Sequence, residues 1–159
     1  MKSVKIRRLE GRTDYKARLA LLKSNKARLV VRKTNKYIIA QIVESDIAQD
    51  KVIVGISSKI LLSKGWPKEK SGSLKSLPAA YLTGLMLGNL AKSKVKEAVL
   101  DSGLNRNVKK SRIYAVLKGA LDSGLSVPHS PEALPSLDNM NPEIKKIFDK
   151  VKSTIKEAK

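Results

Sequence analysis

The sequence RLVVRKTNKYIIAQIVE, residues 28–44, decides how this chain folds. Two runs rich in β-branched residues flank the dipeptide of Thr34 and Asn35, and this pattern predicts a β-hairpin with a two-residue turn. Asn tolerates the positive φ angle that tight hairpin turns require. Such a turn fixes the register of the hairpin and places Lys33 opposite Lys36.

Side chains alternate between the two faces of a hairpin, and the two faces predicted here differ in character. One face is uniformly apolar and is predicted to be core; it consists of Leu29, Val31, Ile38, Ala40 and Ile42. The opposite face carries Arg28, Arg32, Tyr37 and Gln41. Guanidinium groups suit phosphates and an aromatic ring can stack on an unpaired base, so this face is a candidate RNA-binding surface. An ordinary solvated face with an Arg–Tyr pair across the strands explains the pattern equally well.

The charge of the whole chain favours a polyanionic partner. Its 159 residues contain 33 Lys and Arg against 14 Asp and Glu, a formal charge of +19. Residues 1–36 contain thirteen of these cations and only Glu10 and Asp14 as acids. Such a balance indicates nucleic acid or an anionic membrane surface as the partner. The basic arm, residues 1–12, has few large apolar side chains to bury in a membrane interface, which favours nucleic acid.

The composition fits one domain with a hydrophobic core, since 42% of the residues are hydrophobic. The absence of cysteine excludes disulfides and thiolate metal sites. The longest uncharged apolar run, 77–91, is shorter than the roughly 18 residues of a membrane-spanning helix and is predicted to be a buried helix. Gly84 and Gly88 would let this helix lie close to the sheet. The first thirty residues lack the apolar stretch of a signal peptide, which favours a cytoplasmic protein.

The remaining segments predict an α/β fold with a mixed four-stranded sheet. Thr13 is expected to cap one helix, and Ser111 is expected to cap another that Gly124 ends. The predicted elements, in chain order, are an extended arm (1–12), a helix (14–24), three strands (28–33, 36–44, 51–57), a polar loop (63–76), a helix (77–91), a strand (96–101), a helix from Ser111, a Pro-rich linker (127–136) and an amphipathic helix from Asn141.

We divide the chain into three parts on this basis. Residues 1–27 are the basic RNA-binding arm and its short helix, and residues 28–126 form a compact β-β-β-α-β-α domain. Residues 127–159 are the linker and a C-terminal helix whose apolar stripe suggests docking on this domain or on a neighbouring protein.

A second basic cluster surrounds the predicted helix start at Ser111. Its members are Arg106, Lys109, Lys110 and Arg112. Cations at this position oppose the positive end of the helix dipole. An anion bound between them and the free N–H groups would remove the conflict, and chance surface charge is the alternative.

The order of strands and helices is also that of ribonuclease H, which provides the enzyme alternative. That chemistry needs clustered carboxylates to hold two metal ions, with one acid on the first strand. Here the first strand has no acid, Asp46 and Asp50 are expected in a loop, and Asp101 stands alone at a strand end. We therefore expect no enzymatic activity, no metal and no cofactor.

Four stretches, taken together and in order, carry a family resemblance: GRTDYKARLALLKS, RLVVRKTNKYIIAQIVE, LPAAYLTGLMLG and SRIYAVLKGALDSGL. They resemble the archaeal and eukaryotic branch of the family of universal large-subunit ribosomal protein number eighteen, over roughly residues 5–130. The resemblance implies a structural RNA-binding protein that binds 5S rRNA and anchors it to the 23S-type rRNA in the central protuberance. It also implies a monomer within the cytoplasmic ribosome, beside neighbouring large-subunit proteins and away from any membrane.

Some segments depart from the family pattern. The loop after Trp66, PKEKSGSLKS, is longer than usual, and the loop before Ser111 keeps its charged positions without the family's His, Pro, Thr and Gly. Residues from about 136 onward do not align. The predicted RNA-contacting residues, from both lines of reasoning, are Lys5, Arg7, Arg8, Arg12, Thr13, Tyr15, Lys16, Arg18, Arg28, Arg32, Lys33, Thr34, Asn35, Lys36, Tyr37, Gln41, Arg106, Lys109, Lys110, Ser111 and Arg112.

Overall fold

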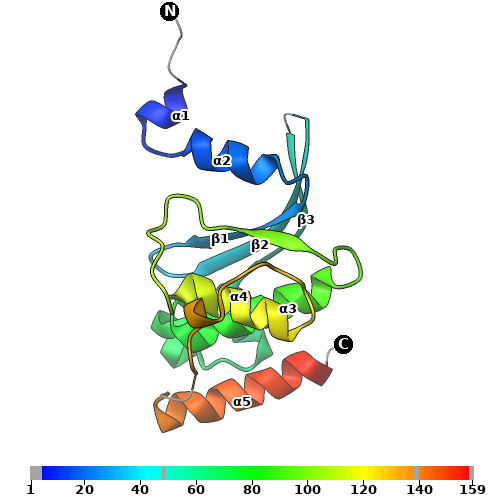
Figure 1. The fold of residues 1–159 in the computed structure, drawn as a ribbon. Helices are drawn as coiled ribbons and strands as arrows, with labels where there is room; N and C mark the ends of the chain where they lie inside the picture. Colours follow the sequence, from blue (N-terminus) through cyan, green and yellow to red (C-terminus); the bar gives the residue numbers. More distant parts are fainter. Residues whose placement is uncertain (1–4, 48, 138–139, 158–159) are drawn as a thin grey trace, which may run out of the picture.

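The computed structural model describes residues 5–47, 49–137 and 140–157, and its centre is a mixed four-stranded sheet (Figure 1). The strands are β1 (Ala27–Lys33), β2 (Ile38–Asp46), β3 (Gln49–Ser57) and β4 (Ala98–Asp101), arranged in the order β3-β2-β1-β4. The β1–β2 and β2–β3 pairs are antiparallel, and β4 lies parallel to β1. The predicted fold class and sheet are therefore confirmed.

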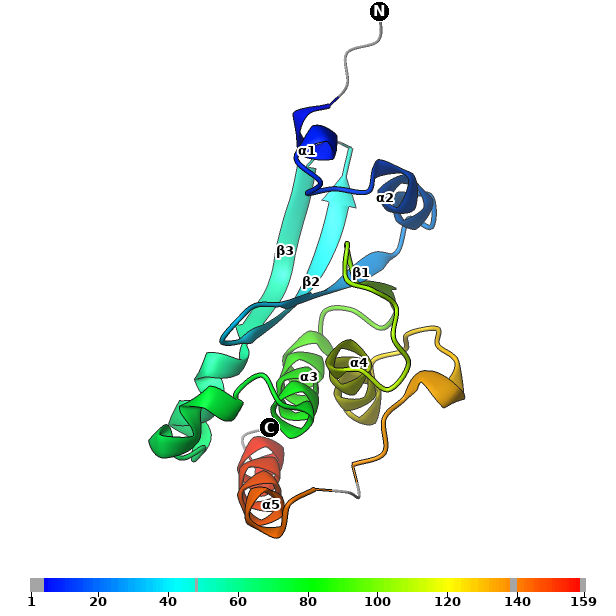
Figure 2. The ribbon, with the colours of Figure 1, turned by 90° about the vertical axis from the view of Figure 1, so that its left-hand side faces the viewer.

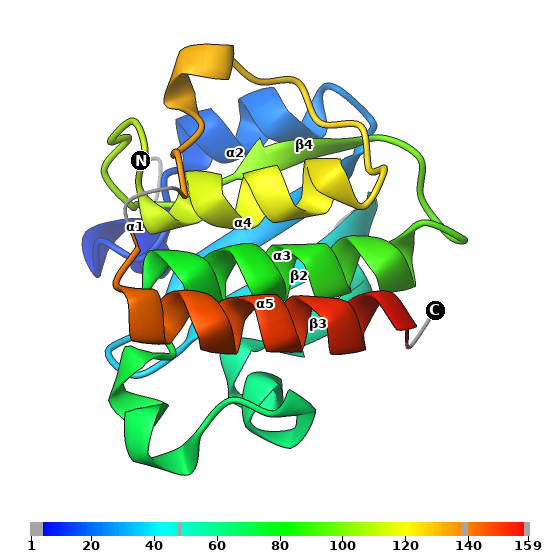
Figure 3. The same ribbon diagram turned by 90° about the horizontal axis from the view of Figure 1, so that it is seen from below.

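The helices lie in layers on the two sides of the sheet. On one side, α3 (Leu77–Ala91) and α4 (Arg112–Asp122) pack beneath the strands, and α5 (Pro142–Glu157) packs on α3 (Figures 1 and 3). The N-terminal α1 (Ile6–Leu9) and α2 (Tyr15–Leu22) lie on the other side (Figure 1). None of the described helices is long and apolar enough to cross a membrane.

The β1–β2 hairpin has a longer loop than the sequence predicts. Lys33 pairs with Ile38 rather than Lys36, so residues 34–37 form the loop. The side chain of Thr34 closes it, because its Oγ1 accepts a hydrogen bond from the Tyr37 N–H at 2.9 Å and donates one to the Tyr37 carbonyl at 2.8 Å. Asn35 therefore has no need of a positive φ angle, and the predicted two-residue turn is wrong.

The register error moves every pair by two residues, and a shift of two keeps each side chain on its predicted face. The predicted core face is confirmed, since Leu29, Val31, Ile38, Ala40 and Ile42 are all almost completely buried. They pack against the two helices beneath the sheet, where the uncharged surface of α3 meets them.

Glycines bring α3 and α4 into close contact. A Cβ atom at Gly84 would overlap the Val116 backbone, and one at Gly119 would overlap the Tyr81 backbone. A Cβ atom at Gly88 would collide with Ser123. Gly84 and Gly88 therefore serve the contact with α4, and the prediction that they let the helix lie close to the sheet is wrong.

The N-terminal segment differs from the prediction in two respects. Residues 6–9 form one helical turn rather than an extended arm, while the first four residues of the arm lie outside the described residues. The cap of α2 is Asp14, whose side chain accepts hydrogen bonds from the N–H groups of Lys16 and Ala17. Asp14 caps better than the predicted Thr13 because a carboxylate also complements the helix dipole.

The long loop after β3 and the C-terminal tail are both folded onto the domain. Residues 58–73 form two 3₁₀ helices, η1 (Ser58–Lys64) and η2 (Lys68–Ser73), around Trp66, which is 2% exposed. A third, η3 (Pro131–Ala133), interrupts the predicted Pro-rich linker. In α5, Phe148 and Val151 are buried, and the Phe148 ring lies 5.5 Å from that of Tyr81. Of the two predicted alternatives, docking on this domain or on a neighbouring protein, the structure shows the first, because α5 packs on α3.

Candidate nucleic-acid interface

Exposed cations gather on the N-terminal segment. The arm and α2 present Lys5, Arg7, Arg8, Arg12 and Lys16 to solvent. Local contacts organise the segment: the Nε–H of Arg7 donates to the Thr13 hydroxyl at 3.1 Å, and the Lys5 ammonium lies 4.4 Å from the centre of the Tyr15 ring. The structure thus brings the predicted N-terminal residues together on one segment.

Arg28 does not belong to this exposed set. Its side chain is 2% exposed, and it donates to Asp101 Oδ2 at 3.0 Å and to Asp50 Oδ1 at 2.7 Å. A third bond reaches the Ser45 hydroxyl at 2.9 Å. The expectation of Arg28 on an open face is therefore wrong, because the parallel pairing of β4 with β1 brings a carboxylate over it.

Asp50 links this buried arginine to α2. The Nη2 of Arg18 donates to Asp50 Oδ2 at 2.8 Å. Figure 2 shows that β2 and β3 extend past β1 toward the N-terminal helices. Burial alone would raise the pKa of Asp50, but hydrogen bonds from Ser45, Arg18 and Arg28, together with the charge of Arg28, outweigh it and lower this pKa to about 2. Asp50 lies in β3 and Asp46 ends β2, so the prediction that both lie in a loop is wrong.

Arg32 is held in one orientation but keeps donors free. Its Nη1 donates to the Asp101 carbonyl at 2.7 Å and to the Val31 carbonyl at 3.0 Å, and its Nη2 donates to Asp101 Oδ1 at 2.8 Å. The guanidinium also lies against Gly103, where a Cβ atom would be 2.8 Å from Arg32 Cζ. Nε and the second hydrogen of Nη2 have no partner among the described residues, and the side chain is 40% exposed. This edge can still bind a phosphate.

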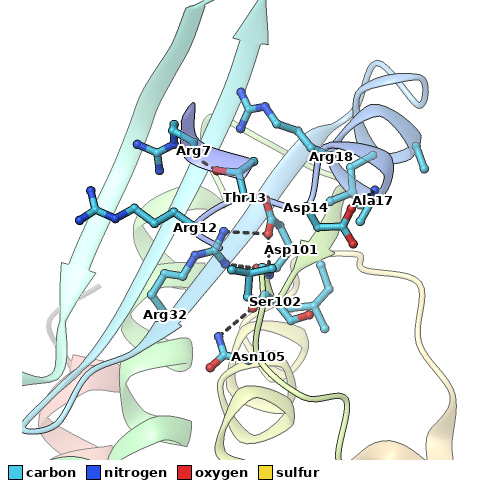
Figure 4. Close-up of a pocket in the computed structure, with 15 residues that line it drawn as sticks. Arg7, Arg12, Thr13, Asp14, Ala17, Arg18, Arg32, Asp101, Ser102 and Asn105 are labelled. Atoms are coloured by element: carbon cyan, nitrogen blue, oxygen red, sulfur yellow. Dashed lines mark hydrogen bonds and ion pairs between the residues drawn. The ribbon is translucent and has the colours of Figure 1, made fainter. Parts of the chain in front are cut away.

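A cleft opens between the N-terminal segment and the loop that follows β4 (Figure 4). Its volume is about 750 Å³, and four arginines line it: Arg7, Arg12, Arg18 and Arg32. The opposite side is formed by residues 100–105. Sequence reasoning missed Ser102, Gly103 and Asn105; the signal was the DSGL turn after a strand, in which Gly103 adopts a φ of +60°.

The β1–β2 loop presents a second group of predicted residues. Lys33, Thr34, Asn35 and Lys36 are exposed, while Tyr37 is half-buried in the loop and packs against the core. Gln41 pairs with Gly55 of β3, and its side chain lies over that glycine. It therefore belongs to the surface of the sheet and not to the β1–β2 loop.

The loop before α4 forms a second cavity, of about 360 Å³. The residues that line it include Lys33, Asn105, Arg106, Lys110 and Arg112. Ser111 occupies the N-cap position without a side-chain hydrogen bond, so its predicted capping bond is absent, and its buried Oγ has no partner among the described residues. Lys109 is drawn instead toward Glu132, at 2.9 Å. Asn105 borders both cavities, so the two basic regions adjoin.

The carboxylates do not form a metal site. Asp50 and Asp101 are both bound by arginines, and no group of three potential ligands occurs in the described part of the chain. Asp101 is therefore not alone, as the sequence suggested, but is held between Arg28 and Arg32. A carboxylate in this position is neutralised by cations, which gives the nuclease alternative no support.

The fold and this surface define a compact, strongly basic α/β protein. Comparison with known families gives the more particular assignment. The family model described as "Ribosomal large subunit proteins 60S L5, and 50S L18" matches residues 2–97 and 91–130. The chain belongs to this family of large-subunit ribosomal proteins, whose members are structural constituents of the ribosome rather than enzymes.

Individual relatives agree with the family match. The large ribosomal subunit protein uL18 of Korarchaeum cryptofilum is 52% identical over 138 residues, which cover 86% of this chain and 69% of the relative. The uL18 protein of Methanococcus maripaludis is 48% identical over 136 residues, covering 85% of this chain and 68% of that protein. The uL18 protein of Caldivirga maquilingensis is 48% identical over 139 residues, which cover 86% of this chain and 65% of that protein. The chain thus spans about two thirds of the length of these relatives.

Proposed function

We propose that this chain binds 5S rRNA and anchors it to the 23S-type rRNA in the central protuberance of the large ribosomal subunit. The observation that carries the proposal is its membership of the L5/L18 family, matched over most of its length. Groups of exposed cations on the N-terminal segment, on the β1–β2 loop and in the loop before α4 support it.

The N-terminal segment would supply affinity through phosphate contacts. Its cations extend from a helical turn that buries no residue, so they can reach a polyanion without disturbing the core. Binding of RNA to such a segment releases condensed counterions and makes affinity strongly dependent on salt. Arg18 and Arg32 add fixed donors, because carboxylates hold their guanidinium groups in place.

The β1–β2 loop and the start of α4 would form the second part of the interface. Lys33 joins Arg106, Lys110 and Arg112 around the second cavity, where an RNA phosphate would meet the positive end of the helix dipole. Because this region adjoins the first cleft, one continuous surface can hold more than one RNA segment. The protein would act as a monomer, with α5 docked on its own domain and neighbouring ribosomal proteins around it.

The test is selective retention of RNA. The full chain is immobilised and incubated with an equimolar mixture of 5S rRNA, transfer RNA and a fragment of 16S-type rRNA of matched length, and the retained RNA is sequenced. We expect 5S rRNA to be enriched at least about tenfold over both competitors at salt high enough to suppress non-specific binding. Equal retention of the three RNAs would show a non-specific cationic surface and would contradict the proposal.

A further inference from the structure

Apolar and charged side chains both line the cleft beneath the N-terminal segment. Its apolar wall consists of Ala17, Ala20 and Leu21 of α2, and Leu100 and Leu104 lie on the opposite side. Ala17 and Ala20 are exposed, and Leu104 is 56% exposed, so this wall is open to solvent in the free protein. The charged part of the lining consists of Arg7, Arg12, Arg18 and Arg32, together with Asp14 and Asp101 (Figure 4).

The arginines of the cleft differ in what they still have to offer a ligand. Arg12 pairs with Glu10 at 3.2 Å and Arg18 with Asp50 at 2.8 Å. Arg7 has only the Thr13 hydroxyl as a described partner, through Nε, so both of its terminal nitrogens remain available. Arg32 keeps its free edge while Asp101 holds the other. Arg7, which has no carboxylate partner among the described residues, and Arg32, whose free edge is fixed in place by Asp101, are thus the two arginines of the cleft best suited to an anion.

Asn105 is one of the neutral polar residues that line the cleft. The Nδ2 of Asn105 donates to the Ser102 carbonyl at 2.7 Å, which fixes the amide and leaves its Oδ1 without a partner in the described chain. An amide oxygen held in this way can accept a hydrogen bond from the exocyclic amine of a base.

We propose that this cleft is a binding site for a single unstacked nucleotide of the bound RNA. Its phosphate lies on Arg7 and the free edge of Arg32, and its base lies against the apolar wall of α2 with an edge toward Asn105. Asp101 is a positioning residue for this site, since it orients Arg32 without touching the nucleotide. The inference rests on the proposed function, because the nucleotide belongs to the RNA that the protein holds.

Size and chemistry select this occupant. A volume of about 750 Å³ lies in the roughly 300–1,000 Å³ range of small-molecule sites, which suits a single nucleotide. A phosphate contact alone would leave the apolar wall in water, whereas an unstacked base covers it. Single-stranded loops and bulges are the parts of RNA whose bases can be extruded in this way.

The test fills the cleft without changing charge. Ala20→Trp places an indole on the apolar wall, and because Ala20 is exposed on α2 the substitution requires no change in the core. Leu19→Trp is the matched control, since Leu19 is 57% exposed on the same helix and does not line the cleft. We expect Ala20→Trp to weaken 5S rRNA binding on the order of tenfold and Leu19→Trp to leave it within about twofold, with unchanged melting temperatures for both.

A second measurement identifies the base. Transcripts of 5S rRNA with single abasic sites are titrated against the wild-type chain and against Ala20→Trp. One abasic position is expected to weaken wild-type binding by a similar factor and to have no further effect on Ala20→Trp. The inference fails if Ala20→Trp binds as tightly as wild type, or if every abasic position weakens both proteins equally. Wild-type protein that does not prefer 5S rRNA over a length-matched RNA would instead overturn the proposed function itself.

Discussion

Asp101 is the counter-charge of two arginines of β1, the buried Arg28 and the partly exposed Arg32. It accepts hydrogen bonds from two arginines, and its Oδ1 also accepts one from the Gly103 N–H at 2.9 Å. The alternation of side chains along β1 predicts the face of the sheet on which Arg28 lies. It does not predict that Asp101 covers Arg28 on that face. The covering carboxylate lies 73 residues away in sequence and arrives only through the parallel β1–β4 pairing.

Neutralising this carboxylate should destabilise the fold. Asp101→Asn leaves Arg28 with only the partly exposed Asp50 as a counter-charge, so we expect the free energy of unfolding to fall by about 2–4 kcal/mol. Urea denaturation at neutral pH measures the change. Glu44→Gln, an exposed carboxyl on β2, is the control and should change stability by less than about 0.5 kcal/mol. Equal stability of Asp101→Asn and wild type would mean that the ion pairs are not formed in solution.

Asp50 should make stability depend on pH in a narrow acidic range. Its pKa is 3.8 in the unfolded reference and about 2 in the folded protein, so folding favours the carboxylate form. The resulting stabilisation is present above pH 3.8 and is lost as the pH falls through about 2. Because a third of the side chain is exposed, solvent screening reduces the effect to about 1 kcal/mol.

This dependence can be isolated with one substitution. Asp50→Asn should be less stable than wild type at pH 6 in urea denaturation, and the difference should shrink as the pH approaches 2, where the wild-type carboxyl also becomes neutral. Asp46→Asn, at an exposed position of the same hairpin without an ion pair in the described chain, should show no such trend. A difference that stays constant down to pH 2 would rule out this role for Asp50.

At the scale of elements, the hydrophobic pattern of the sequence predicts the helices correctly, whereas the turn residues do not predict the hairpin loop. The uncharged run 77–91 correctly predicts α3 with its bounds, and the stripe of Ile144, Phe148 and Val151 correctly predicts an amphipathic helix. The predicted two-residue turn is wrong because a Thr side chain can close a four-residue loop as readily as Asn can support a two-residue turn. The use of Gly84 could not be assigned from sequence, since a small residue permits contact with either a helix or a sheet.

The close α3–α4 contact should not tolerate even a methyl group. In Gly84→Ala the new Cβ would overlap backbone atoms of Val116, which cannot rotate away as a side chain would, so one helix must shift. We expect a loss of about 2 kcal/mol or more in the free energy of unfolding, measured by thermal or urea denaturation. Gly72→Ala is the matched control, because a Cβ there meets nothing within 4 Å and stability should stay within about 0.5 kcal/mol.

At the scale of the molecule, a rigid sheet carries cations that fall into two kinds. Arg18, Arg28 and Arg32 are bound to carboxylates and belong wholly or partly to the fold. The described cations of residues 5–12 make their hydrogen bonds, ion pair and cation–π contact only with residues 5–15. Charge counting predicted that a polyanion binds but could not separate these two kinds, because pairing with distant acids is a property of the tertiary structure. The individual RNA contacts remain predictions.

The most direct test of the account is the salt dependence of 5S rRNA affinity for the full chain and for residues 13–159. Because α1 buries no residue, the truncated protein should keep nearly the same melting temperature. It should bind 5S rRNA more weakly, and the slope of log affinity against log salt should flatten by roughly 0.7–0.9 for each phosphate that the shortened chain no longer neutralises. An unchanged slope, or a truncated protein that melts much earlier, would contradict the claim that the N-terminal segment is an RNA-binding surface carried by an independent fold.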